Sequence, residues 1–377
     1  MHICVISPSY PTTKTIDFIF VDQLCRAFAD RGEKVTIIAP QSLTKCIFRS
    51  IPLSRKHSFI RTETGNKIEI YRPYTITFGN SWIGNLFKDS FNNAVNRVAN
   101  RLKKKPDVCY GHFWQSINAI SLFAKENNIP LFGASGEENV ELYAKYTDEE
   151  KHLLSQCIKG IINVSTKNRN ECLNLNLITE EKSIVIPNAI NLSLFKQQDK
   201  KKCRNKLGIK DDDFVVAFVG QFVVRKGTLR LNEALKKIND RSIKAIFIGT
   251  GNESPDYEGI IYKGKVNHDE LPLYLSASDI FVLPTDNEGC CNAIIEAMAC
   301  GLPIISTDKP FNHDILNKDN SVLIDCYNIN QIAESIELLR RDNDKRKKMS
   351  QCALKSAENL SIDKRAERII NFIVSKK

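Results

Sequence analysis

Short apolar runs alternate with longer amphipathic stretches along most of the chain. The runs are rich in β-branched residues, and most are followed by a stretch whose apolar residues recur at helical spacing. Strands buried on both faces are apolar throughout, whereas the helices that cover them are apolar on one face only. The alternation therefore predicts an α/β fold with parallel sheets covered by helices.

Two series of expected strands divide the chain, and its 377 residues fit two α/β domains better than one core. A helix is expected across Asp17–Arg31, another across Ile362–Val374, and a linker over the lysine-rich stretch Lys196–Lys206. The first series of strands comprises His2–Ser7, Lys34–Ala39, Asp107–Gly111, Ile129–Ala134, Gly160–Val164 and Ser183–Ile186. The second comprises Phe214–Gly220, Ile243–Gly249, Gly259–Tyr262, Asp279–Leu283 and Leu302–Ser306.

Composition narrows the class of protein. The 12 cysteines form no C-x-x-C pair, no apolar run is long enough to span a bilayer, and Met1–Ser7 reads as a strand and not as a leader. We therefore expect a cytoplasmic protein with free thiols. The net charge of +10 favours a phosphate-bearing substrate or a membrane surface. Nucleic acid is not an expected partner, because no nucleic-acid-binding motif is present.

The segment Asn287–Pro303 (NEGCCNAIIEAMACGLP) carries the clearest chemistry. It follows an expected strand and places Glu288 in a loop and Glu296 within the next helix. Gly289 allows close approach of the backbone to a ligand, and the amides of the next three residues lie at a helix N-terminus, where phosphate or other acceptor oxygens bind. A carboxylate further along this helix can bind a vicinal diol, as acidic residues bind ribose in dinucleotide folds.

This segment resembles the signature of the family-4 retaining glycosyltransferases of the GT-B fold. Gly220–Gly227 (GQFVVRKG) resembles the turn that holds the donor diphosphate, and Gly249–Gly251 resembles a glycine turn at the base of the cleft. Pro187–Phe195 is similar to the stretch that crosses between domains. The resemblance is close over the C-terminal half of the chain and looser over the N-terminal half.

The resemblance implies two facing Rossmann-like domains with a central interdomain cleft. The acceptor-binding domain would span residues 1–195, with a C-terminal helix over 361–377 packed back on it. The domain that binds the nucleotide-sugar donor would span residues 196–360.

Roles for individual residues follow from the same resemblance. Lys226, with Arg225 beside it, would neutralise the donor diphosphate. Glu288 would accept hydrogen bonds from the transferred sugar, and Glu296 would bind the ribose diol. The other donor-binding positions would be Gly220, Gln221, Gly249, Gly289, Cys290, Cys291 and Asn292.

The chain departs from the family pattern in three places. Gln221 stands where the family usually has an arginine, so Arg225 is a candidate to supply that charge. The first loop lacks the usual glycine pair, and Lys14 in this loop is a candidate donor to phosphate or acceptor. Where the family often has a histidine on the acceptor side, this chain reads SGEEN, which makes Glu137 or Glu138 a candidate beside His112.

A basic helix is expected around Trp82–Lys105, and it has two interpretations. It packs in the core, or its apolar side touches a membrane, which would suit a lipid-linked acceptor and a peripheral position on the inner face of the plasma membrane. The apolar side would carry Trp82, Ile83, Leu86, Phe87, Phe91, Val95 and Val98.

These features favour a hexosyltransferase of cell-surface polysaccharide biosynthesis. It would transfer a sugar from a nucleotide diphosphate sugar to a glycan or lipid-linked saccharide, and the resemblance implies retention at the anomeric carbon. No metal or other cofactor is expected, because Lys226, Arg225 and helix-start amides would take the place of a divalent cation. Two alternatives stay open: a nucleotide-sugar 2-epimerase, and a catalytically degenerate binding subunit of a glycan-assembly complex.

Overall fold

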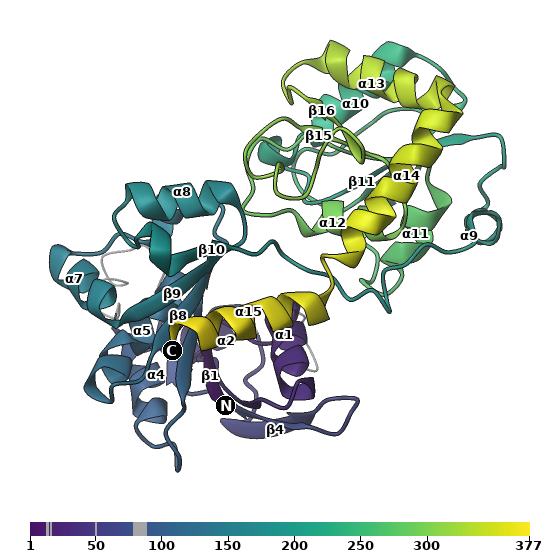
Figure 1. Ribbon diagram of the computed structural model, residues 1–377. Helices are drawn as coiled ribbons and strands as arrows, with labels where there is room; N and C mark the ends of the chain where they lie inside the picture. Colours follow the sequence, from purple (N-terminus) through teal and green to yellow (C-terminus); the bar gives the residue numbers. More distant parts are fainter. Residues whose placement is uncertain (13–14, 16, 50, 78–88) are drawn as a thin grey trace. The chain divides into compact units, whose positions relative to one another are not determined.

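The computed structural model describes residues 1–377 except 13–14, 16, 50 and 78–88 (Figure 1). The chain forms two compact units. The first consists of Met1–Ile186 and Ile362–Lys377, and the second of Pro187–Ser361. The boundary after residue 195 expected from the sequence thus lies at Ile186 in the structure, so the stretch that begins at Pro187 belongs to the second unit.

The first unit is built on an eight-stranded sheet with the order β10-β9-β8-β7-β1-β2-β5-β4. All neighbouring strands are parallel except β4 and β5, which are antiparallel. The strands are β1 (His2–Ile6), β2 (Lys34–Ile38), β4 (His57–Arg61), β5 (Lys67–Tyr71), β7 (Val108–His112), β8 (Leu131–Ser135), β9 (Ile158–Asn163) and β10 (Ser183–Val185). Short strands β3 (Gln41–Ser42) and β6 (Tyr74–Thr75) pair separately.

Helices cover both faces of this sheet. On one face α1 packs against α15, which is yellow in Figure 1, and Ile369 and Ile373 of α15 join the core there. On the other face α4 and α5 pack together, and Phe91 and Val95 of α4 are buried between them and the sheet. The helices are α1 (Ile19–Asp30), α2 (Leu43–Arg49), α4 (Ser90–Ala99), α5 (Trp114–Glu126), α6 (Val140–Tyr143), α7 (Asp148–Cys157), α8 (Thr166–Asn174), α15 (Ile362–Lys376) and the 3₁₀ turn η1 (Glu180–Lys182).

The helix expected around Trp82–Lys105 is therefore shorter in the described residues, where α4 ends at Ala99. Phe91 and Val95 belong to the core, so this part of its apolar side is not available to a membrane. The expectations for Trp82, Ile83, Leu86 and Phe87 lie outside the described residues.

The second unit is built on a six-stranded parallel sheet with the order β13-β12-β11-β14-β15-β16. The connection leaves β11 toward β12 on one side and returns to β14 on the other. The ends of β11 and β14 therefore form a topological switch point, where ligands bind in open α/β sheets. The strands are β11 (Phe214–Val219), β12 (Ile243–Ile248), β13 (Ile260–Gly264), β14 (Ile280–Leu283), β15 (Ile304–Thr307) and β16 (Ser321–Ile324).

The expected linker over Lys196–Lys206 is largely helical in the structure. Helix α9 begins at Lys200, and Arg204 is only 4% exposed, with its Nη2 atom 2.8 Å from Oδ2 of Asp279. This segment is thus part of the second unit, because it buries side chains against it. Helix α9 ends at Leu207. The other helices are α10 (Thr228–Ile238), α11 (Leu271–Ala277), α12 (Asn292–Ala299), α13 (Ile329–Arg341) and α14 (Asn343–Glu358), and η2 (Val224–Lys226) is a 3₁₀ turn.

Candidate functional site

Two glycine turns bring the loops after β11 and β12 into contact. Gly249 has φ of +149°, and a Cβ atom on it would lie 1.9 Å from the carbonyl oxygen of Gly220. Its amide donates to the carbonyl of Gly264 at 2.8 Å. Only glycine allows this approach, because any side chain would clash with the neighbouring backbone. The loops are thus held close to the carboxyl ends of the strands, where both glycines were expected.

A third turn places two cationic side chains beside the loop after β14. Residues Arg225 and Lys226 lie in η2, and Gly227 then turns the chain into α10 with φ of +76°. A Cβ atom on Gly227 would lie 2.3 Å from the carbonyl oxygen of Pro284. This close packing holds the turn against the loop that carries Glu288.

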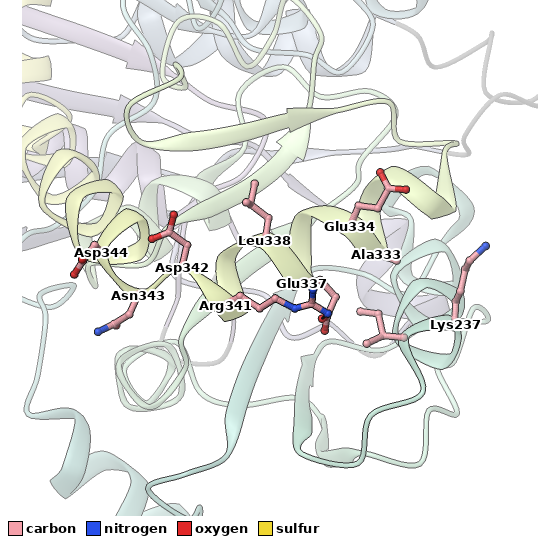
Figure 2. Close-up of a pocket in the computed structure, with 10 residues that line it drawn as sticks. Lys237, Ala333, Glu334, Glu337, Leu338, Arg341, Asp342, Asn343 and Asp344 are labelled. Atoms are coloured by element: carbon pink, nitrogen blue, oxygen red, sulfur yellow. Dashed lines mark ion pairs between the residues drawn. The ribbon is translucent and has the colours of Figure 1, made fainter.

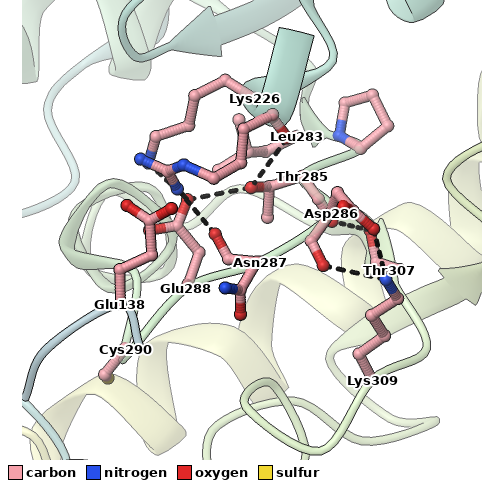
Figure 3. Close-up of polar contacts among 12 residues, drawn as sticks. Glu138, Lys226, Leu283, Thr285, Asp286, Asn287, Glu288, Cys290, Thr307 and Lys309 are labelled. Atoms are coloured by element: carbon pink, nitrogen blue, oxygen red, sulfur yellow. Dashed lines mark hydrogen bonds and ion pairs between the residues drawn. The ribbon is translucent and has the colours of Figure 1, made fainter. Parts of the chain in front are cut away.

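Glu288 is the centre of a buried polar cluster. The side chain of Lys226 donates to Oε1 of Glu288, and the same oxygen accepts from Nη1 of Arg225 and from Oγ1 of Thr285, both at 2.9 Å. Figure 3 shows Lys226, Thr285 and Glu288 converging, and Glu288 is only 8% exposed. Arg225 also donates to the carbonyl of Asn287 at 2.6 Å. Two cations and a hydroxyl therefore fix one carboxylate at the switch point.

Electrostatics keep Lys226 charged. Burial lowers its pKa, but the charges that Cys291 and Glu288 carry when ionised and the hydrogen bond to Glu288 outweigh burial, so its pKa lies above the usual value. Burial raises the pKa of the Cys291 thiol to about 11, so this group is neutral at pH 7. Glu288 is thus the anion that holds Lys226 protonated under ordinary conditions.

Helix α12 carries the second glutamate of the motif. Oε1 of Glu296 lies 3.0 Å from Nε2 of His268, and the Glu296 side chain is 12% exposed. The His268 ring packs edge-on against Phe195, with ring centres 4.9 Å apart. Its pKa is raised, chiefly by the hydrogen bond to Glu296 and by that residue's charge, which together outweigh burial. His268 was not among the predicted site residues, although its position after β13 places it at the same edge of the sheet.

The start of α12 is supported by a residue from the beginning of the second unit. The side-chain amide of Asn188 donates to the carbonyl of Cys290 at 3.2 Å and to Oδ1 of Asn292 at 2.9 Å. Cys291 occupies the N-cap position of α12. Gly289 is buried beside it. The helix start is therefore held in place by Asn188, a contact that the sequence did not reveal.

Gln221 is exposed in the structure, directly after Gly220. The side chain of Arg225, the candidate replacement for the missing arginine, is directed to Glu288 and the Asn287 carbonyl. Thr285, which contacts the same carboxylate, was not predicted. The sequence signal that could have indicated Thr285 is its position, because it is a polar residue two positions after the buried strand β14.

His112 lies at the end of β7 in the first unit and is 4% exposed. Aromatic rings of Phe20 and Phe113 surround it, with ring centres at 5.2 and 4.8 Å. Burial, helped by the charge of Arg365, lowers its pKa to about 3, so the ring is neutral at pH 7. Its Nδ1 atom is buried, and no described residue forms a hydrogen bond with it. Lys14, the other candidate from the first loop, lies outside the described residues.

Glu137 is held inside the first unit by several donors. Its Oε1 accepts from the amide of Trp114 at 2.7 Å, and its Oε2 accepts from Ser135 Oγ and the Gly136 amide, both at 2.9 Å. Burial raises its pKa even though these hydrogen bonds favour the charged form. The contacts give Glu137 a structural role at the start of α5, and its assignment to the acceptor stays a prediction.

A broad hollow of about 980 Å³ lies elsewhere on the second unit (Figure 2). Lys237, near the end of α10, lines it together with residues of α13 and the start of α14, and Figure 2 shows side chains of both charge signs around it. Because α10 runs back from the carboxyl end of β11, this hollow lies toward the opposite edge of the sheet. It contains none of the predicted site residues.

Neither a metal-binding cluster nor a membrane-spanning helix is found among the described residues. Within the part of the chain that the structure describes, no group of three or more His, Cys, Asp or Glu side chains is arranged to hold a metal ion. Likewise, no helix among the described residues combines the length and apolar character that crossing a bilayer requires.

Part of the chain matches a known protein family. Residues 199–356 match the model of the glycosyl transferases group 1. TuaC of Bacillus subtilis, provisionally described as a teichuronic acid biosynthesis glycosyltransferase, is 27% identical, with 89% of this chain and 88% of TuaC covered. An Escherichia coli UDP-Gal:alpha-D-GlcNAc-diphosphoundecaprenol alpha-1,3-galactosyltransferase is 26% identical, with 65% of this chain and 68% of that protein covered.

Solved structures share the fold over the whole chain. Sucrose-phosphate synthase from Thermosynechococcus elongatus superposes with a TM-score of 0.79 at 18% identity, covering 99% of this chain and 98% of that one. Anabaena Alr3699/HepE in complex with UDP-glucose gives a TM-score of 0.72 at 17% identity, with both chains fully covered at 100%. Residues 199–356 therefore match the glycosyl transferases group 1, the chain has the GT-B fold, and it is an enzyme that transfers sugars.

Proposed function

We propose that this enzyme transfers a sugar from a nucleotide diphosphate sugar to a hydroxyl of a glycan or lipid-linked saccharide. The anomeric configuration would be retained, as in family 4, and the product would enter a cell-surface polysaccharide. The observation that carries the proposal is the cluster in which Lys226, Arg225 and Thr285 hold Glu288 at the switch point of the second sheet.

The roles of the cluster follow from its charges. In the free enzyme the Lys226 ammonium is neutralised by Glu288, and a donor diphosphate would attract the same ammonium. Negative charge develops on the diphosphate as the glycosidic bond breaks, so a fixed cation there lowers the barrier. Glu288 would accept hydrogen bonds from the sugar hydroxyls, and the amides from Gly289 to Asn292 would contact the sugar and the β-phosphate.

Glu296 would bind the nucleoside part of the donor. One of its oxygens is engaged by His268, and a vicinal diol of ribose would use the remaining acceptor capacity of the carboxylate. The two glutamates would therefore hold opposite ends of the donor, with Lys226 between them. In this arrangement Lys226 and Arg225 would serve where other glycosyltransferases use a divalent metal.

Names of similar proteins support the kind of substrate. TuaC is named for teichuronic acid biosynthesis, and the E. coli relative is named for a UDP-sugar donor and a lipid-diphosphate acceptor. HepE was solved with UDP-glucose. By analogy with these proteins, we propose a UDP-sugar donor for the present chain and an acceptor at the inner face of the plasma membrane. The enzyme would then act there as a cytoplasmic, peripheral membrane protein. The relatives are named as glycosyltransferases, so neither the epimerase nor the binding subunit is proposed.

A ligand panel tests the proposal. UDP-, GDP-, ADP- and dTDP-sugars are titrated into the full chain with EDTA present, and thermal stability is recorded, because a ligand that binds the native state raises it. We expect one nucleotide class to stabilise the wild-type enzyme and to stabilise the Glu296→Gln variant much less. If no nucleotide sugar binds, or if binding needs a divalent metal, the proposed donor site is wrong.

A further inference from the structure

Arg72 is a buried cation whose partners among the described residues are all neutral. It follows β5 in the first unit and is 7% exposed. Its Nη2 atom donates to the carbonyl of Pro11 at 2.9 Å, its Nη1 atom donates to Ser58 Oγ at 3.1 Å, and its guanidinium lies 5.7 Å from the centre of the Tyr10 ring. Its Nε atom is buried and has no hydrogen-bond partner within the part of the chain that the structure describes. Buried charges in proteins are normally paired with an opposite charge, so this arrangement needs an explanation.

Two hollows meet at Arg72. They measure about 590 and 400 Å³, and both are lined by Tyr10, Leu53 and Arg72. The second also includes Pro8, directly after Ser7, and Ala39, directly after Ile38, so it lies at the carboxyl ends of β1 and β2. Ligands bind at this edge of open α/β sheets, which makes the position suitable for a binding site.

The lining of the hollows is positively charged. It contains the basic residues Arg26, Arg55, Arg72 and Lys45 and the acidic residues Asp17 and Asp22. Asp22 is already engaged, because its Oδ2 accepts from Nε of Arg26 at 2.7 Å and its Oδ1 accepts from the Tyr10 hydroxyl. The acidic residue that is linked to Arg72 through Tyr10 is thus occupied, and the charge of Arg72 is left for a ligand.

Apolar side chains surround the same opening. Ile51, Leu53 and Phe59 line the hollows and are 38%, 37% and 57% exposed. A buried cation inside an apolar and basic rim fits a ligand that joins an anionic group to a less polar skeleton. Arg is the side chain best suited to bind phosphate or carboxylate, because its planar N–H groups match their oxygens.

We propose that this pair of hollows binds an anionic group of the acceptor, a phosphate or a carboxylate, and that Arg72 is its ligand. The inference rests on the proposed function and adds to it the chemical class of acceptor. If Arg72 served only to hold Pro11 and Ser58 by hydrogen bonds, substitution of Arg72 would not change the affinity of the protein for anions.

Calorimetry on the full chain tests the proposal, with saturating UDP present so that the donor site cannot take up the anions. The probes are geranyl diphosphate, inorganic diphosphate and glucuronate. The variants are Arg72→Gln, Arg72→Lys as a charge-retaining form, and Arg97→Gln as a matched control on the exposed surface of the same unit. Melting temperature and UDP affinity of each variant report whether the fold is intact.

We expect the wild-type enzyme to bind at least one probe, Arg72→Gln to bind it about tenfold more weakly or worse, and Arg97→Gln to match the wild type. Binding of geranyl diphosphate alone indicates a lipid-linked diphosphate, binding of glucuronate alone indicates an acidic sugar, and equal binding of inorganic diphosphate indicates that the phosphate group suffices. If Arg72→Gln does not fold, weakened but detectable binding by Arg72→Lys supports the same site.

Two results overturn the inference: no probe binds to the wild-type enzyme, or a folded Arg72 variant binds as tightly as the wild type. A failure of UDP itself to bind is a separate result. It contradicts the proposed donor site, while the titration with anions in the first unit can still be read.

Discussion

Nε2 of His268 and Oε1 of Glu296 lie 3.0 Å apart at the carboxyl edge of the second sheet. The two residues come from different elements, the loop after β13 and the middle of α12. The contact with Phe195 restrains the imidazole ring, and the imidazole in turn restrains the carboxylate. Glu296 is therefore held in one orientation before any ligand binds, which lowers the entropy cost of binding a diol.

The His268 pair predicts a pH-dependent contribution to stability. The pKa of His268 is raised in the folded state, so protonation stabilises the fold below the unfolded value of about 6.5 and this contribution is lost as pH rises through the folded pKa. At about pH 5.5 the unfolding free energy of the wild type should therefore be higher than that of His268→Gln, by less than about 1 kcal/mol because the pair is partly exposed. At about pH 8 this difference should be smaller. Urea unfolding measures this.

The control for that measurement is His152→Gln, which removes an exposed histidine of α7. NMR titration of the imidazole provides a second readout, because Glu296→Gln should lower the pKa of His268. A gap between wild type and His268→Gln that widens from about pH 5.5 to about pH 8 would contradict the assigned sign.

Substitution of Glu296 tests the diol contact. We expect Glu296→Gln to weaken UDP binding by about tenfold, because a charge-assisted hydrogen bond to the ribose is replaced by a neutral one. Glu334→Gln, an exposed change on α13, serves as the control. Isothermal titration with UDP measures both, and equal affinity of Glu296→Gln and wild type would remove Glu296 from the site.

Substitution of Lys226 tests charge stabilisation in the reaction. We expect Lys226→Met to lower kcat by about 10²- to 10³-fold with a smaller effect on donor affinity, since the developing charge on the diphosphate loses its cation. The fold should persist, because Arg225 and Thr285 still hold Glu288. Lys236→Met, on the outer part of α10, is the control. Steady-state transfer assays decide, and an unchanged kcat would mean that Lys226 has no part in catalysis.

Central parallel strands and the loops after them could be predicted from the sequence, because such strands are continuous apolar runs. The edge strand β4 and its partner β5 were missed: β4 alternates half-buried and exposed positions, so it has no continuous apolar run. The lysine-rich stretch between the two series of strands predicts a linker, but the structure has a helix that begins at Lys200, and Arg204 in this helix is buried and paired with Asp279. Burial of a charged residue depends on a partner far along the chain, which local patterns do not contain.

The same limit applies to the candidate site. The motif around Glu288 and the turn around Lys226 each have a local signature, so both could be found. The direction of Arg225 and the pairing of His268 with Glu296 depend on how loops after different strands fold together. Glu137 has the residue type of a site carboxylate, but the donors that surround it come from separate segments of the first unit.

Alanine substitutions at two glycines with positive φ allow the cost of backbone strain to be distinguished from the cost of a steric clash. Gly208 ends α9 with φ of +69°, and a Cβ atom on it would meet nothing within 4 Å. Gly208→Ala should therefore cost only about 1 kcal/mol of unfolding free energy. Gly249→Ala should cost about 3 kcal/mol or more, because its Cβ atom would lie 1.9 Å from the Gly220 carbonyl and must push the loop after β11 aside. Urea unfolding of the two variants, with UDP titration of whatever folds, compares them directly. Equal losses of stability, or normal UDP affinity in Gly249→Ala, would show that the contact between the two glycine turns does not shape the donor site.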